Sequence, residues 1–247
     1  MTLRIRRVIR QVINALGYDL YLTDSNAFGT NPYRDISKLV KRKRPIILDV
    51  GANQGNTVLE FRKKLPGCVI HAFEPSPEVY RKLKTSTDGL SDVYLNNVAL
   101  GSEIGERTLQ ISSLSGMTSL LNPGKDYWGE VVNVVSVPVT TLDRYRIDNR
   151  IEYVDVIKLD TQGFDFEVLR GSSIALTESR IHLVLIEIIF NEIYEGAASP
   201  EEILSFMRSH GFRLVAFYGC HLINEYASWT DALFVNNLYM RRLSGAS

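Results

Sequence analysis

The stretch IILDVGANQG, residues 46–55, joins a short apolar run to a turn that contains two glycines. Ile46–Val50 has the length and composition of a strand that is buried on both faces of a parallel sheet. Gly51 and Gly55 let the backbone turn tightly, so that the first amides of the next helix can face a ligand. That helix is predicted over Asn56–Lys64. The stretch therefore predicts a strand, a binding turn and a helix, the repeating unit of an α/β fold.

The same alternation of apolar strands and capped helices continues toward the C-terminus. Strands connected through helices imply a mainly parallel sheet that is covered on both faces. The last two strands are close enough in sequence to pair antiparallel around a loop at His221–Trp229. Further strands are predicted at residues 69–73, 93–95, 154–159, 182–188, 212–217 and 232–235, and further helices at 77–85, 141–145, 165–169 and 200–210.

Residues 103–140 interrupt this alternation. Two β-like segments, Thr108–Ile111 and Val131–Val139, flank the polar segment Ser112–Gly129. This pattern predicts a hairpin-like insertion into the α/β fold. Because its tip carries aromatic side chains, including Trp128, we interpret it as a lid over the ligand site.

The composition is that of a globular protein. The chain of 247 residues is 45% apolar and 23% charged, and it is long enough to bury a full core. Its two cysteines are too few for a disulfide framework, which favours a reducing, cytoplasmic location. No apolar run approaches the length of about 18 residues that a membrane-spanning helix needs.

The net charge of zero is the sum of two unequal parts. Residues 1–44 contain ten Lys and Arg against three acids, a net charge of +7, which leaves −7 for residues 45–247. We therefore divide the chain into a basic N-terminal helical extension, 1–44, and a main domain, 45–247. Helices are predicted at residues 3–16 and at Asp35–Arg44. The first is basic and amphipathic, so it either caps the domain, pairs with a partner or contacts an anionic membrane surface.

The residues around the glycine turn restrict the ligand. A dinucleotide-binding turn has three glycines in the pattern G-x-G-x-x-G, whereas only Gly51 and Gly55 occur here. Asp49 precedes them, and a carboxylate there repels a pyrophosphate but favours a cation such as the ammonium of a methionyl group. Glu74 ends the next strand, 19 residues after Gly55, where it can accept two hydrogen bonds from a ribose diol. NAD and S-adenosylmethionine both carry that diol, and Asp49 favours the second.

The third strand region is followed by Asn97 and Val98. Ligands of such sheets bind at the carboxyl ends of the strands, so these two residues are placed to border an adenine ring. The alternative is an ordinary turn at the end of the strand, made with asparagine and glycine.

Six short motifs occur in order along the chain: DVGANQG (49–55), FEP (73–75), NVALG (97–101), KLDTQG (158–163), VLRG (168–171) and DALFV (231–235). Together they resemble the FkbM family of S-adenosylmethionine-dependent methyltransferases, over about residues 45–237. The resemblance implies the Rossmann-like class I methyltransferase fold. This is an α/β fold with a seven-stranded, mainly parallel sheet, an antiparallel C-terminal strand and helices on both faces. It also implies O-methylation of a hydroxyl on a sugar, glycan or secondary metabolite, with a small-molecule or glycan acceptor as the partner.

One position departs from the family pattern. Many members have Asp-Val-Glu-Gly after the fourth strand, and Gln162 stands here in place of that glutamate, so no role is carried over for it. The residues that the resemblance assigns to binding S-adenosylmethionine are Asp49, Gly51, Asn53, Gly55, Glu74, Ser76, Asn97 and Val98.

Methyl transfer to a hydroxyl needs a base or an anchor near the hydroxyl proton, because the hydroxyl pKa is high. Asp160, at the end of the fourth α/β strand, is the first candidate. Glu187, at the end of the next strand, is the second, and His221, in the predicted hairpin loop, is the third. We predict no metal site. The alternative is a divalent cation held by Asp160 and Glu187, with an oxygen of Gln162.

Two other classes of function stay open at this point. One is an NAD-dependent oxidoreductase, which the missing third glycine and Asp49 oppose. The other is a nucleoside-binding module that has lost catalytic activity. Nucleic acid is not an expected partner, because the main domain carries a net charge of −7 and no Asn-Pro-Pro-Tyr motif occurs. The sequence does not indicate an oligomeric state.

Overall fold

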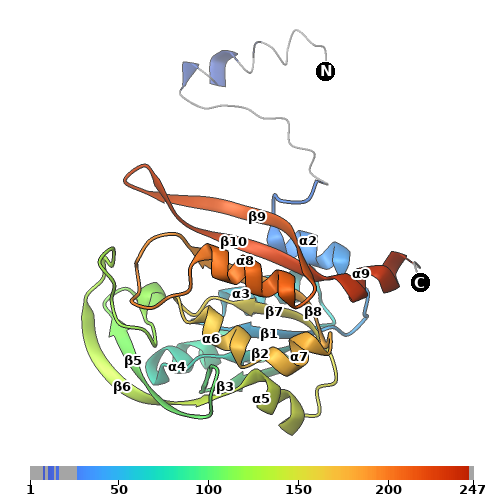
Figure 1. Ribbon diagram of the computed structural model, residues 1–247, viewed down its shortest axis with the longest axis horizontal. Coiled ribbons are helices and arrows are strands. Elements are labelled where there is room, and N and C mark those ends of the chain that lie inside the picture. Colours follow the sequence, from blue (N-terminus) through green and yellow to red (C-terminus); the bar gives the residue numbers. More distant parts are fainter. Residues whose placement is uncertain (1–7, 9–10, 14, 17–26, 245–247) are drawn as a thin grey trace.

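The structure is a computed structural model that describes residues 8, 11–13, 15–16 and 27–244. Within these residues, seven strands form one sheet in the order β3-β2-β1-β7-β8-β10-β9 (Figure 1). Neighbouring strands run parallel except at β10, which is antiparallel to both β8 and β9, and this confirms the predicted fold class. The strands are β1 (Ile46–Val50), β2 (Val69–Phe73), β3 (Val93–Asn96), β7 (Val154–Leu159), β8 (Ile181–Ile189), β9 (Phe212–Ile223) and β10 (Tyr226–Asn236).

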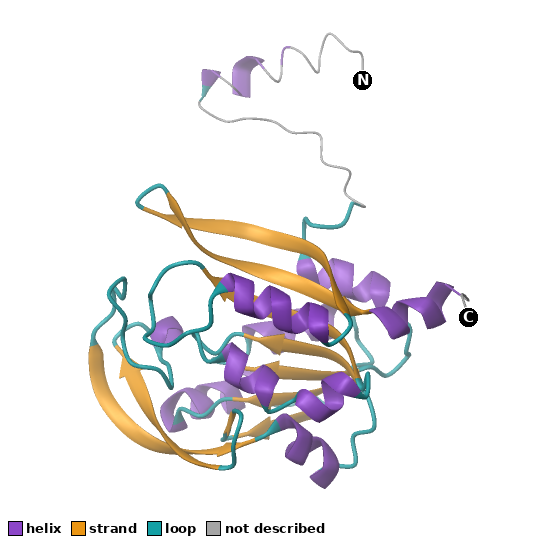
Figure 2. Cartoon of the chain, viewed as in Figure 1, coloured by secondary structure: helices purple, strands orange, loops and turns teal. Residues whose placement is uncertain are grey.

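Both faces of the sheet are buried under helices (Figure 2). Successive side chains point to opposite faces, so Val156 packs in one core and Ile157 in the other. This double burial is the reason why most residues of the central strands are apolar, with Asp49, His71 and Lys158 among the buried exceptions. One core contains residues of α5 (Leu142–Asp148), α6 (Asp165–Arg170), α7 (Ser173–Thr177) and α8 (Pro200–Ser209), and the other contains residues of α2 (Pro32–Leu39), α3 (Asn56–Lys64), α4 (Pro77–Ser86) and α9 (Asn237–Ser244).

The insertion forms a second, smaller sheet among the described residues. Its strands β5 (Gly105–Ser112) and β6 (Val131–Thr140) pair antiparallel, and β6 also pairs parallel with β4 (Ala99–Leu100). Between β5 and β6 the chain passes through the short 3-10 helix η1 (Ser115–Met117). Ser119 then donates a hydrogen bond of 2.7 Å to the carbonyl oxygen of Gln162, which ties this segment to the carboxyl end of β7.

Two predicted segments differ most from the structure. The helix expected at Asp35–Arg44 spans Pro32–Leu39, and it begins early because the Asn31 side chain accepts a hydrogen bond from the amide of Arg34 and so caps the helix. The loop expected at His221–Trp229 is mostly strand. Only Asn224 and Glu225 form the turn, with φ angles of +50° and +69°, values typical of a tight two-residue hairpin turn. The helices α7 and α9 were not predicted.

The predicted N-terminal helix at residues 3–16 lies mostly outside the described residues. Of its positions, residues 8, 11–13 and 15 are described and are helical. The division into a basic extension and a main domain stays a prediction. On the extension side of that boundary, Ile36, Leu39 and Val40 pack in the same core as Ile47 of β1. The structure contains, in the part that it describes, no helix long and apolar enough to cross a membrane.

Candidate active site

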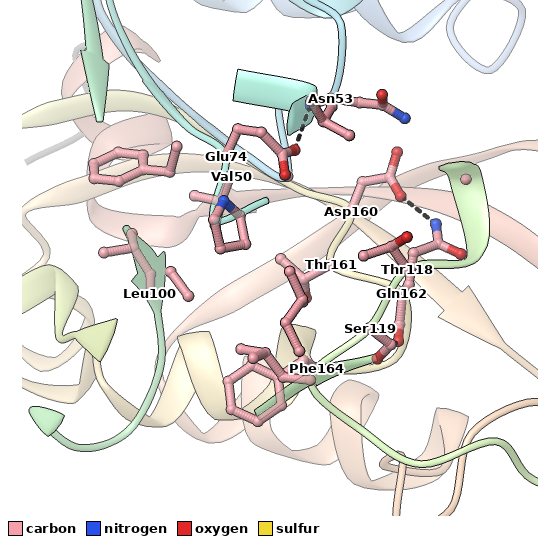
Figure 3. Close-up of a pocket in the computed structure, with 18 of the residues that line it drawn as sticks. Val50, Asn53, Glu74, Leu100, Thr118, Ser119, Asp160, Thr161, Gln162 and Phe164 are labelled. Carbon is pink, nitrogen blue, oxygen red and sulfur yellow. Dashed lines mark hydrogen bonds between the residues drawn. The ribbon is translucent and has the colours of Figure 1, made fainter. Parts of the chain in front are cut away.

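A cavity lies at the carboxyl ends of β1, β2 and β7, where α/β proteins bind their ligands (Figure 3). Apolar side chains and a few polar groups line it together, which is typical of sites for small molecules and cofactors. We call it the first cavity. Residues that line it include Val50, Gly51, Asn53, Phe73, Glu74, Val98, Leu100, Gly116, Thr118, Ser119, Asp160, Thr161, Gln162 and Phe164.

Gly51 brings the ends of β1 and β7 together beside the first cavity. Its φ angle of +78° lies in the left-handed region that favours glycine. A Cβ at this position would lie 1.9 Å from the carbonyl oxygen of Asp160. Only a glycine therefore allows the turn after β1 to pass this close to the turn after β7.

Glu74 is buried at the end of β2 and lines the first cavity. Its Oε2 accepts a hydrogen bond of 3.0 Å from the amide of Asn53, and its Oε1 accepts one of 2.9 Å from the amide of Ser76. Burial raises the pKa of Glu74 to about 7, although these two amides lower it. The carboxylate is thus fixed in position, and its remaining lone pairs are available to a ligand in the cavity.

The other predicted cofactor residues divide into two groups. Gly51, Asn53 and Val98 line the first cavity with Glu74. By contrast, the described residues that line this cavity do not include Asp49, Gly55, Ser76 or Asn97. Asn97 lies one step away, where its Nδ2 donates to the carbonyl oxygens of Glu74 and Pro75 at 2.8 and 3.0 Å and so holds the loop after β2.

Asp49 is fully buried on β1. Neither of its carboxylate oxygens has a hydrogen-bond partner among the described residues, and the Nζ of Lys158 lies 4.0 Å from Oδ1. Burial raises the pKa of Asp49 to about 6, although Lys158 lowers it. Two buried carboxylate oxygens without a partner are costly, so the position is primed to receive a cation or a hydrogen-bond donor.

Lys158 connects Asp49 to the candidate catalytic residue Asp160. Its buried Nζ lies 2.8 Å from Oδ2 of Asp160. The Nε2 of Gln162 donates a hydrogen bond of 2.7 Å to Oδ1 of Asp160, as Figure 3 shows. Burial raises the pKa of Asp160, but the ammonium of Lys158 and these hydrogen bonds outweigh it and hold the pKa below its ordinary value. Asp160 is therefore an oriented carboxylate. Sequence reasoning missed Lys158, although a lysine inside an apolar strand was a signal.

Glu187 lies at the end of β8, in a second cavity that adjoins the first. The second cavity also contains Asp160 and Gln162, and it reaches Trp128 and Tyr194. Burial, together with the nearby carboxylates of Asp160 and Asp165, raises the pKa of Glu187 well above its ordinary value. The structure thus brings the first two predicted catalytic residues to one cavity and pushes their pKa values in opposite directions, which is typical of acid–base sites.

His221 lies apart from Asp160 and Glu187. It is part of β9 rather than of a loop, and its ring stacks on Trp229 with 4.6 Å between centroids. Among the described residues that line the first and second cavities, His221 does not occur.

The described residues contain no group of three or more His, Cys, Asp or Glu side chains arranged to hold a metal ion. Both oxygens of Asp160 already accept hydrogen bonds, from Lys158 and Gln162. The site geometry thus gives no support to the alternative of a cation between Asp160 and Glu187.

The sheet order with a single reversed strand, the glycine turn after β1 and the buried carboxylate after β2 define the Rossmann-like fold of class I methyltransferases. The chain belongs to the FkbM methyltransferase family, because the sequence profile described as "Methyltransferase FkbM domain" matches residues 49–214. This confirms the predicted family and the predicted enzyme class.

Two curated relatives and one solved structure illustrate the similarity. The chain is 27% identical over 195 residues to "2-O-methyltransferase NoeI" of Sinorhizobium fredii, covering 74% of this chain and 79% of the relative. It is 28% identical over 196 residues to "Methyltransferase sdnD" of Sordaria araneosa, covering 68% and 73%. The crystal structure of methyltransferase FkbM from Methylobacillus flagellatus shares the fold, with a TM-score of 0.52 and 15% identity. That alignment covers 83% of this chain and 48% of the solved one, so this chain spans about half the solved chain's length.

Proposed function

We propose that this methyltransferase uses S-adenosylmethionine to O-methylate a hydroxyl on a sugar or glycan. The observation that carries the proposal is the pairing of two adjoining cavities. In the first, Glu74 is held by two backbone amides. In the second, Asp160 and Glu187 face one space. A relative named for 2-O-methylation supports the choice of a hydroxyl acceptor.

The residues around the first cavity fit S-adenosylmethionine. Glu74 has the free lone pairs to accept both hydroxyls of a ribose diol, and Val98 offers an apolar contact for a base. Asp49 is fully buried and does not line this cavity, so it offers no direct contact to the ligand there. When bound, S-adenosylmethionine supplies a methyl group on a positively charged sulfonium.

The residues of the second cavity would orient the acceptor. Asp160 is fixed by Lys158 and Gln162 and accepts a hydrogen bond from a sugar hydroxyl without taking its proton, because its pKa is low. The Glu187 carboxylate, with its raised pKa, is the better proton acceptor for the reacting hydroxyl. The segment that carries η1 borders both cavities through Gly116 and limits the access of water.

The function is tested by calorimetric titration with S-adenosylhomocysteine, S-adenosylmethionine and NAD. We expect the first two to bind and NAD not to bind. Because Glu74 has a pKa of about 7 in the free protein and must be ionised to accept the diol, affinity should fall about tenfold per pH unit below pH 7. Binding at pH 6 should therefore release a proton, which buffers of different ionisation enthalpy reveal.

Glu74→Gln is the matched control for this titration. The amide keeps the size of the side chain but cannot titrate, so the slope with pH should flatten and the affinity should fall about 10- to 100-fold. A slope that persists in Glu74→Gln would show that another group titrates. Binding of NAD alone would overturn the methyltransferase chemistry proposed for this site.

The division of labour between Glu187 and Asp160 is tested by their amide variants. With a panel of p-nitrophenyl hexosides as acceptors, Glu187→Gln should lower kcat about 10²- to 10⁴-fold with little change in KM. It should also remove the rise of kcat with pH that ionisation of Glu187 produces in the parent enzyme. Asp160→Asn should chiefly raise the acceptor KM. The reverse assignment, with the pH dependence lost in Asp160→Asn, would make Asp160 the base.

A further inference from the structure

Three hollows of the molecule adjoin one another and share lining residues. The first and second cavities share Asp160 and Gln162. The second cavity in turn shares Trp128 and Trp229 with a third hollow, which we call the outer groove. The outer groove is open to solvent, and its empty volume of about 1620 Å³ is three times the 540 Å³ of the second cavity. The proposed acceptor site therefore continues outward past two tryptophans.

The two tryptophans form a stacked pair at this junction. Trp128 comes from the insertion and Trp229 from β10, and their rings lie 5.8 Å apart with an angle of 20° between planes. Trp229 stacks on His221 as well, with an angle of 9°. Because Trp229 is held by these neighbours, it fixes Trp128, which stays 47% exposed. The exposed part of the Trp128 indole is thus a preformed platform rather than a loose side chain.

One wall of the outer groove is formed by the paired strands of the β9–β10 hairpin. Strand β10 pairs with β8 only from Trp229 onward, so the hairpin end that carries Tyr226 projects beyond the neighbouring strand (Figure 2). Tyr226 is 76% exposed, although it lies in a paired strand. On the other side of the groove Phe190, which follows β8, is 45% exposed. Aromatic rings on ordered backbone are therefore displayed to solvent along the groove.

The polar residues of the outer groove indicate the chemistry of its ligand. Asn191, Asn224 and Asp126 line it beside the aromatic rings. Lys125 also lines it, but its Nζ forms an ion pair with Glu192 at 3.0 Å. The described lining residues therefore include no unpaired cation that could bind an anionic ligand. A wholly apolar ligand would cover the amides without replacing their hydrogen bonds to water. Aromatic rings beside amide and carboxyl groups fit a neutral ligand that has apolar faces to stack on the rings and hydroxyl groups at its edge to form hydrogen bonds.

We propose that the outer groove is a second saccharide subsite. The acceptor is then a neutral glycan of at least two units. Its methylated unit occupies the second cavity beside Asp160, and the neighbouring unit stacks on Trp128 and is held by the groove amides. This inference rests on the proposed function and specifies, in addition, that the acceptor contains at least two saccharide units.

The experiment uses the full chain loaded with S-adenosylhomocysteine. The labelled protein is applied to an array of neutral mono- and oligosaccharides with varied linkages. Oligosaccharides should bind at least about tenfold more tightly than their constituent monosaccharides. The array hits are then titrated in solution by tryptophan fluorescence, which reports on this junction alone because Trp128 and Trp229 are the two tryptophans of the sequence.

Variants of the platform separate stacking from other effects. Trp128→Ala should lose at least about tenfold of the oligosaccharide affinity while affinity for S-adenosylhomocysteine is retained, and Trp128→Phe should recover part of the loss. Tyr226→Ala should weaken the binding of oligosaccharides more than the binding of monosaccharides. Tyr94→Ala, which removes an exposed tyrosine from β3, is the matched control and should have no effect.

Each contrary result has a distinct meaning. If S-adenosylhomocysteine does not bind, the proposed function itself fails. If it binds but no oligosaccharide binds more tightly than its constituent monosaccharides, only the second subsite is overturned. The same holds if Trp128→Ala leaves the oligosaccharide affinity unchanged. Preferential binding of alkyl glycosides through their alkyl chains would likewise overturn it and assign the groove to an apolar ligand.

Discussion

Replacement of Gly51 with alanine is expected to remove cofactor binding and to lower the melting temperature by about 10 °C or more. The new Cβ would lie 1.9 Å from the carbonyl oxygen of Asp160, far inside van der Waals contact with a backbone atom. Because a backbone oxygen cannot rotate away, the ends of β1 and β7 must separate. The left-handed φ of +78° adds a cost of about 1–2 kcal/mol for any residue with a Cβ. Differential scanning calorimetry and titration with S-adenosylhomocysteine measure both effects.

Gly89→Ala is the matched control for Gly51→Ala. Gly89 has nearly the same φ angle, +75°, but a Cβ there would meet no atom within 4 Å. Its replacement should cost only the conformational term of about 1–2 kcal/mol and leave cofactor binding intact. Equal losses in the two variants would mean that the backbone conformation, and not the approach of β1 to β7, makes Gly51 necessary.

Replacement of Lys158 with methionine is expected to reduce the free energy of unfolding by about 3 kcal/mol at neutral pH. The variant keeps most of the side-chain volume but leaves the carboxylates of Asp49 and Asp160 without their cation. Asp49 is fully buried, whereas the Asp160 side chain is 37% exposed. The loss of stability should therefore lie at the lower end of the range observed when one partner of a buried ion pair is removed. Urea denaturation followed by circular dichroism provides the measurement.

The effect of Lys158→Met should depend on pH in a defined direction. In the parent protein the lowered pKa of Asp160 contributes stability above its ordinary pKa, and this is lost as the pH falls. In the variant the carboxylates of Asp49 and Asp160 have raised pKa values, so its stability decreases as the pH rises. The difference between parent and variant should therefore shrink from pH 8 to pH 4.

A double variant provides the control for this prediction. Asp160→Asn removes one of the two charges that Lys158 compensates, so Lys158→Met should cost less in the Asp160→Asn background than in the parent. If instead the cost is the same in both backgrounds and at every pH, Lys158 contributes through packing of its methylenes alone.

Much of the fold was predictable because its signals are local. The bounds predicted for β1, α3, β2 and β7 coincide with those observed. Each of the three strands is buried on both faces, so most of its residues are apolar, and polar or glycine residues mark its ends. The errors fall where local signals are weak. The hairpin strands β9 and β10 extend past the buried sheet with mostly exposed residues, so their sequence carries no apolar pattern that predicts a strand.

The catalytic side of the site was predicted only in part. Asp160 follows β7, and Glu187 lies near the end of the neighbouring parallel strand β8, so their meeting in one cavity follows from topology. Topology does not explain why their pKa values shift in different directions. The pKa of Asp160 is lowered by Lys158, whereas the pKa of Glu187 is raised by burial. His221 illustrates the limit, since sequence spacing could not show that its ring stacks on Trp229.

The sequence by itself determined the order of the strands in the main sheet's chain path, the glycine turn after β1, the carboxylate that follows β2 and the family. These features depend on residues a few positions apart, through backbone conformation, capping and the burial of whole strands. Only the tertiary structure decided that Asp49 is removed from the first cavity, that Lys158 holds Asp160, and that Trp128 meets Trp229. Contacts of this kind join segments far apart in the chain, and their geometry arises from packing that no local pattern encodes.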